Sequence, residues 1–184
     1  MKLLQILLLF ILSTVSIIAY GAKLPRAEDV IVPTIPAQGY EAPYLLLNCG
    51  DFRLRYEVEK FMVNRGLLNK YDDIALPGAA MGIDNPKMLE WQQTFIEALG
   101  ALKKLHKLKN VIIIDHKDCG MYNLVYGRDI TKDPKEELKI HRKHLLSAKK
   151  NIQKVHPDLK VELLIMDIQN SDHVVKVHTI DKLS

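Results

Sequence analysis

The chain has 184 residues and a formal net charge of +4. Once an N-terminal leader is set aside, about 160 residues remain, which is the size of one domain with a single core. The sequence has no internal repeats or low-complexity tracts, and no aromatic residues are interleaved with its main lysine cluster. These features argue against a nucleic-acid-binding surface, which would combine basic residues with stacking platforms.

The first 21 residues have the pattern of a secretory signal peptide. Lys2 provides a positive start, residues 3–18 are mainly apolar, and Ala19 and Gly21 are small residues ahead of a cleavage site before Ala22. The apolar stretch is interrupted by polar side chains and is shorter than the about 20 residues of a membrane span. We therefore predict an exported protein, periplasmic or secreted, with no stable membrane anchor after cleavage. An uncleaved anchor is the alternative.

Prolines dominate the segment that follows the predicted leader. Pro25, Pro33, Pro36 and Pro43 lack N–H donors and restrict the backbone angle φ. Residues 22–43 are therefore expected to form an extended N-terminal arm rather than a helix. Residues 44–184 are expected to form a single domain.

Within residues 44–184, signals for strands and helices alternate. Asn85 before Pro86 and Asp133 before Pro134 are typical helix starts. The repeated β-α-β pattern predicts an α/β fold with a central, mostly parallel sheet of four strands plus an antiparallel edge strand, and helices on both faces. The four parallel strands are expected at residues 44–47, 73–76, 111–114 and 161–166, and the edge strand, with its alternating polarity, at 174–177.

The helix predicted after Asp133 combines a basic surface with an apolar stripe. The stripe recurs at helical spacing and consists of Leu138, Leu145, Ala148, Ile152 and Val155. The basic residues occupy the remaining faces: Lys135, Lys139, Arg142, Lys143, Lys149, Lys150 and Lys154. His141 and His144 lie three residues apart on this helix but have no third ligand, so we expect them to be solvated surface residues.

Two polar motifs stand directly after predicted parallel strands. Cys49, Asp51 and Arg53 follow the first strand, and His116 and Cys119 follow the third. Parallel strands bring their carboxyl ends to one edge of the sheet, where ligands bind, so these side chains are expected to meet. Two cysteines and one histidine are the protein ligands of an open, catalytic zinc site, with the fourth position left for water or substrate.

The two cysteines also allow a different outcome. An exported protein enters an oxidising compartment, where Cys49 and Cys119 would form a disulfide that closes a long loop. A purely structural bridge has no need of Asp51 and Arg53 beside one cysteine, or of His116 beside the other. We therefore favour Zn²⁺ and keep the disulfide as the alternative.

The two motifs resemble those of the beta class of carbonic anhydrases, Cys-x-Asp-x-Arg after the first strand and His-x-x-Cys-Gly after the third. The resemblance implies reversible hydration of carbon dioxide to bicarbonate by a zinc-bound hydroxide. It also implies that Cys49, His116 and Cys119 bind zinc, that Asp51 accepts a hydrogen bond from the hydroxide, and that Arg53 orients the aspartate. A homodimer or higher homo-oligomer is expected by resemblance only.

Two positions depart from the family pattern and keep other functions open. Phe52 stands where the family usually has a small serine, and residues 75–79 lack the usual Arg-Asn pair. We expect Phe52 to line an apolar pocket or to pack in the core or between subunits, and Gly78 either to let backbone approach the pocket or to serve a simple turn. The alternatives are hydrolysis of carbonyl sulfide or carbon disulfide on the same zinc shell, or a non-catalytic exported protein that binds metal or is stabilised by a disulfide.

Overall fold

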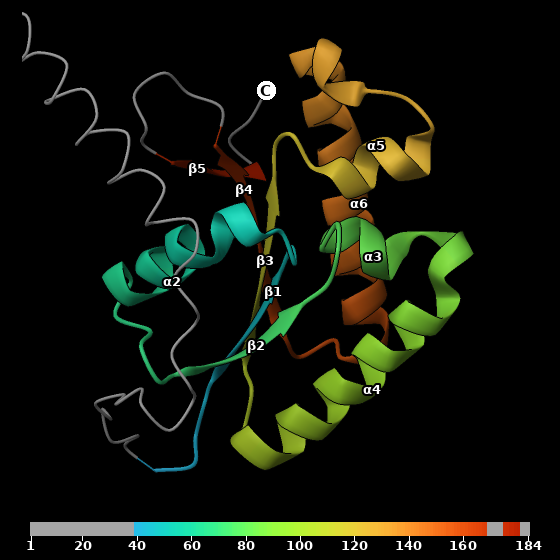
Figure 1. Cartoon of the computed structure of the whole chain (residues 1–184). Coiled ribbons are helices and arrows are strands. Elements are labelled where there is room, and N and C mark those ends of the chain that lie inside the picture. The colour runs from blue at the N-terminus through green and yellow to red at the C-terminus, as the bar shows by residue number, and fades with distance from the viewer. Residues whose placement is uncertain (1–38, 169–174, 181–184) are drawn as a thin grey trace, which may run out of the picture. The chain divides into compact units, whose positions relative to one another are not determined.

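A computed structural model describes residues 39–168 and 175–180, which contain a single five-stranded sheet (Figure 1). The strand order is β2-β1-β3-β4-β5, in which the first four strands are parallel and β5 pairs antiparallel with β4. The predicted fold class is therefore confirmed. The strands are β1 (Tyr44–Asn48), β2 (Tyr71–Ala75), β3 (Asn110–His116), β4 (Lys160–Asp167) and β5 (Lys176–Thr179).

Helices cover both faces of this sheet. Within the described residues, the α-helices are α2 (Arg55–Asn64), α3 (Ala80–Asp84), α4 (Leu89–His106), α5 (Gly120–Tyr126) and α6 (Pro134–Val155). Short 3-10 helices in the same part of the chain join them: η2 (Phe52–Leu54), η3 (Pro86–Met88) and η4 (Ile130–Lys132). Figure 1 shows α2 on one side of the sheet and α3, α4, α5 and α6 on the other. Because β1 to β4 are parallel, each crossover between them runs from the carboxyl end of one strand to the amino end of the next.

Both predicted helix starts are confirmed. The side chain of Asn85 accepts a hydrogen bond from the backbone N–H of Lys87 at 2.9 Å and opens η3, which continues into α4. The side chain of Asp133 accepts from the backbone N–H groups of Lys135 and Glu136 at 2.9 and 3.2 Å, and opens α6. These contacts satisfy N–H groups that have no partner inside the helix.

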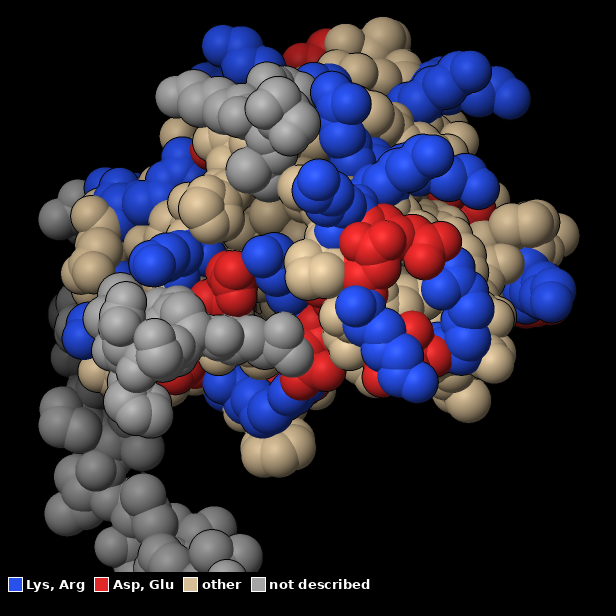
Figure 2. Space-filling view, turned by 90° about the horizontal axis from the view of Figure 1, so that it is seen from above, with Lys and Arg blue, Asp and Glu red and all other residues tan. Residues whose placement is uncertain are grey.

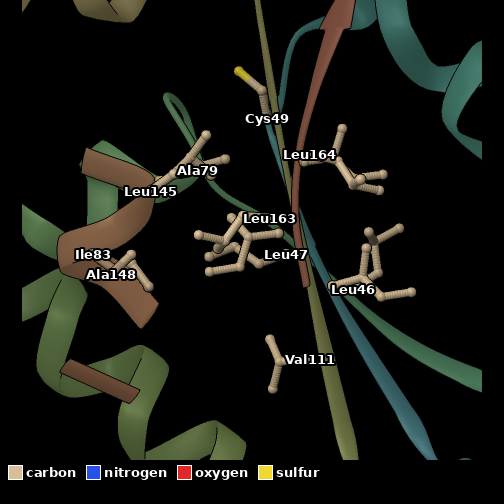
Figure 3. Packing of buried hydrophobic residues seen from close by; sticks show 14 of the residues in the cluster. Leu46, Leu47, Cys49, Ala79, Ile83, Val111, Leu145, Ala148, Leu163 and Leu164 are labelled. Carbon is tan, nitrogen blue, oxygen red and sulfur yellow. The ribbon is translucent and has the colours of Figure 1, made fainter. Parts of the chain in front are cut away.

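The strands that carry the two motifs lie in the middle of the sheet and are buried on both faces. Side chains of successive residues point to opposite faces, so each strand contributes to two layers of packing. Figure 3 shows Leu47 of β1 and Leu163 of β4, the other neighbour of β3, on the side of α3 and α6, and Leu46 of β1 and Leu164 of β4 on the other side. All four are at most 3% exposed. Full burial of such a side chain stabilises the fold by about 1.5–3 kcal/mol, so these strands form a rigid base for the loops that follow them.

The prediction that His141 and His144 are solvated is wrong. They are 0% and 7% exposed. His141 lies on the buried stripe of α6, which continues with Leu145, Ala148 and Ile152 at intervals of four, three and four residues. The ring of His144 is held by Asp84, whose carboxylate lies 2.9 Å from Nδ1. The predicted apolar stripe ends one turn early, since Val155, the last residue of α6, is 53% exposed.

The described end of the predicted N-terminal arm is attached to the domain. The backbone N–H of Ala42 donates to the carbonyl of His106, and the carbonyl of Pro43 accepts from the N–H groups of Lys109 and Asn110. The predicted signal peptide and the rest of the arm lie outside the described residues. Within residues 39–168 and 175–180, no helix has the length and apolar character needed to cross a membrane.

Surface charges of both signs lie among one another on the face seen from above (Figure 2). Many of them are paired, as in Arg128 with Glu136 at 2.6 Å and Arg65 with Glu162 at 2.8 Å. Exposed pairs of this kind contribute little to stability, because water and salt screen them. The core and the parallel sheet therefore determine the position of the candidate site.

Candidate metal centre

Cys49, His116 and Cys119 meet at the carboxyl edge of the sheet. Cys49 follows the last residue of β1, His116 ends β3, and Cys119 directly precedes α5. Strands β1 and β3 are hydrogen-bonded neighbours, which brings the ends of both strands together. The three ligand atoms lie within 4.8 Å of one another, and all three residues are buried. The arrangement predicted from the order of the strands is thus present in the structure.

The two cysteines are unbonded, and their sulfur atoms lie 3.9 Å apart. A disulfide bond is about 2.05 Å long. Two thiolates on a tetrahedral zinc ion, each with a Zn–S bond of about 2.3 Å, would place their sulfur atoms about 3.8 Å apart. The distance therefore suits two ligands of one metal ion.

The imidazole of His116 presents an unprotonated nitrogen to this cluster. Its Nδ1 lies 2.8 Å from the carbonyl oxygen of Lys117, and because a carbonyl only accepts, Nδ1 carries the proton in the neutral ring. Its Nε2 is buried and has no hydrogen-bond partner within the described residues. A buried polar atom without a partner is costly, and a metal ion would satisfy it. The donor set of two thiolates and one imidazole fits Zn²⁺.

The thiols differ in their electrostatic environment. A hydrogen bond from Cys119 holds the pKa of Cys49 well below its ordinary value against the opposing effect of burial, and His116 and the Gly78 N–H act in the same direction. The Cys49 thiolate and burial raise the pKa of Cys119, although the backbone N–H groups of Tyr122 and Met121 favour its thiolate. Without metal the pair therefore holds one negative charge, and metal binding would displace the remaining proton.

Burial and neighbouring charges shift the pKa of His116 in opposite directions. Burial is the largest single effect and disfavours the imidazolium, but the Cys49 thiolate, the carbonyl of Lys117 and the charge of Asp115 together outweigh burial and leave the pKa of His116 raised. A proton and a metal ion would therefore compete for Nε2 of His116.

The turn at Gly78 contacts the cluster through its backbone. The N–H of Gly78 donates to Sγ of Cys49 at 3.3 Å. Gly78 has a φ of 76°, and a Cβ added there would lie 2.6 Å from Cε of Met81, so a side chain would not fit without displacing its neighbours. The predicted close approach of backbone at Gly78 is confirmed.

Asp51 and Arg53 form an ion pair beside the cluster. The carboxylate of Asp51 accepts from the backbone N–H of Arg53 at 3.0 Å and from Nη2 of its guanidinium at 2.7 Å. These hydrogen bonds, opposed by burial, lower the pKa of Asp51 to about 2. Its Oδ2 lies 3.8 Å from Nε2 of His116. An ionised carboxylate, which can only accept hydrogen bonds, therefore borders the metal ligands.

Sequence reasoning missed the second partner of Arg53. Its Nη1 donates to Oδ2 of Asp118 at 2.7 Å and its Nη2 to the carbonyl of Asp118 at 2.9 Å, so Arg53 links the two motifs. The N–H of Asp118 donates to Glu137 at 2.7 Å. The position of Asp118 between His116 and Cys119 could have indicated that it lies at the site. The sequence around Glu137 gave no such indication, because on a charged helix this residue has the pattern of a surface residue.

Phe52 neither lines a pocket nor packs in the core, so two of the three positions predicted for it are wrong. Its side chain is 84% exposed, whereas Leu54 in the same 3-10 helix is 2% exposed. The short helix η2 turns Leu54 inward and Phe52 outward. Packing of Phe52 between subunits stays a prediction.

Comparison with known proteins agrees with this geometry. A family model described as "Putative carbonic anhydrase" matches residues 41–178. An uncharacterised protein of Rickettsia conorii is 34% identical over 128 residues, which cover 70% of this chain and 69% of the relative. An uncharacterised protein of Rickettsia bellii is also 34% identical over 128 residues, which cover 70% of this chain and 78% of the relative.

The beta-carbonic anhydrase isoform I of Trichomonas vaginalis, known from a crystal structure, has a similar fold. It aligns with a TM-score of 0.50 at 14% identity, over 95% of this chain and 96% of its own. Together with the match to the family model, this similarity shows that the chain belongs to the carbonic anhydrase family described by that model and has the fold of the beta class.

Proposed function

We propose that this protein catalyses the reversible hydration of carbon dioxide to bicarbonate at one zinc ion held by Cys49, His116 and Cys119. The observation that carries the proposal is the buried cluster of three ligand atoms within 4.8 Å, with Nε2 of His116 left without a hydrogen-bond partner in the described chain. A zinc ion there would lower the pKa of a water molecule from 15.7 to about 7 and so supply a nucleophile at neutral pH.

Asp51 is suited to orient the water molecule and the product. It stays ionised at neutral pH, because Arg53 holds its pKa near 2. Since it only accepts hydrogen bonds, it selects a partner that carries a proton, either water or the hydroxyl of bicarbonate. Arg53 acts through Asp51 as a positioning residue, with its guanidinium fixed on the other side by Asp118.

The surroundings of the ligands are suited to an apolar substrate. Cys49, His116 and Cys119 are at most 4% exposed, and the two cysteines belong to the main hydrophobic core. Carbon dioxide carries no charge and loses little on leaving water, whereas polar competitors lose hydration. Fixed charges also act more strongly in such a site than in water.

We expect the zinc-loaded wild type to accelerate carbon dioxide hydration, with a rate that rises through about pH 7. Stopped-flow measurement with a pH indicator and elemental analysis test this together, with one zinc per chain expected. Protein stripped with a chelator is the control and should regain activity on addition of zinc. A zinc-loaded protein no faster than buffer would reject the proposed reaction and leave hydrolysis of carbonyl sulfide or carbon disulfide, or a non-catalytic metal-binding protein, as the alternatives.

Export of the protein is a further part of the proposal and rests on residues 1–21 alone. A cleavable signal peptide should be removed, so protein isolated from its native host should begin at Ala22 or a residue close to it. N-terminal sequencing measures this directly. Recovery of Met1 in a membrane fraction would instead indicate an uncleaved anchor.

A further inference from the structure

Asp115 is a buried carboxylate that the proposed reaction does not use. It precedes His116 on β3 and is 1% exposed. Because successive residues of a strand point in opposite directions, the side chain of Asp115 points away from that of His116. It faces α3, α5 and α6, and each of these helices contributes one hydrogen-bond donor to it.

Both oxygens of the Asp115 carboxylate accept hydrogen bonds. Oδ1 accepts from the backbone N–H of Ala80 at 3.0 Å, while Oδ2 accepts from the hydroxyl of Tyr122 at 2.5 Å and from Nδ1 of His141 at 2.9 Å. Tyr122 and His141 are fully buried, and their ring centroids lie 4.0 Å apart. Burying a carboxylate is costly unless its partners are well placed, so these three donors are held in fixed positions around Asp115.

Through Ala80, Asp115 is connected to the turn whose backbone contacts Sγ of Cys49. Ala80 stands two residues after Gly78, whose N–H donates to Sγ of Cys49 at 3.3 Å. Ala79, between them, has φ 38° and ψ −101°, which is a strained conformation for a residue with a side chain. A strained turn persists only where its surroundings hold it. Here the hydrogen bond to Asp115 holds one end of the turn and the contact with Cys49 the other.

Through Tyr122, Asp115 is also connected to the backbone of Cys119. Tyr122 lies in the first turn of α5, directly after Cys119, and its N–H donates to the carbonyl of Cys119 at 3.1 Å. By anchoring the Tyr122 hydroxyl, Asp115 fixes the start of α5 and hence the position of Cys119, which directly precedes this helix.

We propose that Asp115 is a positioning residue for both cysteine ligands: through Ala80 it holds the Gly78 N–H against Sγ of Cys49, and through Tyr122 it holds the start of α5 at Cys119. Hydrogen bonds to a thiolate withdraw electron density from it and so tune its bond to a metal. The inference rests on the proposed zinc site but concerns the metal–sulfur bonds rather than the reaction.

Asp115→Asn tests this proposal, because its amide has one acceptor oxygen and cannot accept from all three donors. We expect its affinity for zinc to fall about 10–100-fold in competition with a chelator. With cobalt(II) in place of zinc, the thiolate-to-cobalt absorption band should move to longer wavelength, since sulfur electrons are less stabilised without their hydrogen bonds. Tyr122→Phe, which removes a single donor, should give a smaller change in the same direction.

Tyr126→Phe is the matched control, because its hydroxyl contacts His144 at 3.0 Å in a neighbouring, part-buried pair. Its cobalt spectrum and zinc affinity should equal those of the wild type. If Asp115→Asn and Tyr122→Phe are folded by circular dichroism and keep the wild-type spectrum and affinity, Asp115 is only structural and the proposal is overturned. Should Asp115→Asn not fold, Tyr122→Phe decides by the same criterion.

The outcomes also separate this proposal from the proposed function. A wild type that binds neither cobalt nor zinc overturns both. A wild type that binds cobalt through its thiolates but does not hydrate carbon dioxide overturns the proposed function alone, because affinity and absorption are measured without turnover.

Discussion

Cys119→Ser is expected to lose both the bound zinc and the hydration activity. A serine hydroxyl is not deprotonated at neutral pH and is a weak ligand for zinc, so only Cys49 and His116 would remain. The loss of affinity should exceed the about 10–100-fold that follows removal of an outer hydrogen-bond partner. Chelator competition and stopped-flow hydration measure the two effects on the same preparation.

Leu124→Ser provides the matched control for this substitution. Leu124 lies on α5, five residues after Cys119, and is 74% exposed, so serine there should leave zinc binding and activity unchanged. Retention of stoichiometric zinc by Cys119→Ser would contradict the assigned ligand set. A wild type without titratable thiols and with a mass two hydrogens lighter would instead identify a disulfide between Cys49 and Cys119.

The parallel sheet could be predicted because its central strands are continuous apolar runs. Leu45, Leu46 and Leu47 are all fully buried, which is the burial expected for a strand covered on both faces. Once the strands were placed, the position of Cys49 and His116 at their carboxyl ends followed from the parallel arrangement. The metal ligands were therefore accessible to sequence reasoning although they are distant in the chain.

The groups that support the ligands could not be predicted in the same way. Asp115, Glu137 and His141 are polar residues whose burial depends on how α6 packs against the sheet. The four-, three- and four-residue spacing from His141 to Ile152 contained the signal, but the many lysines on the helix favoured a solvated interpretation. Backbone contacts such as that of Gly78 with Cys49 depend on a turn conformation that residue types alone do not specify.

Asp51→Asn is expected to retain zinc and to lower the hydration rate about 10–100-fold. The asparagine amide keeps one acceptor but gains a donor, so it no longer selects a proton-bearing partner, and Arg53 loses the negative charge that fixes it. Asp118→Asn is the matched control. It also removes a carboxylate from Arg53, but the carbonyl of Asp118 still accepts from Nη2, so its effect should be much smaller.

The ion pair of Asp51 with Arg53 should also make the stability of the protein depend on pH. Arg53 lowers the pKa of Asp51 from 3.8 to about 2, so the ionised side chain contributes stability that is fully present above about pH 4 and is lost as the pH falls towards 2. Urea unfolding of the metal-free protein isolates this contribution, because acid also protonates the zinc ligands. Wild type should exceed Asp51→Asn in stability at pH 6, and the difference should shrink between pH 4 and 2. A difference that does not change with pH, together with full activity of Asp51→Asn, would reject the role assigned to the Asp51–Arg53 pair while leaving the three metal ligands in place.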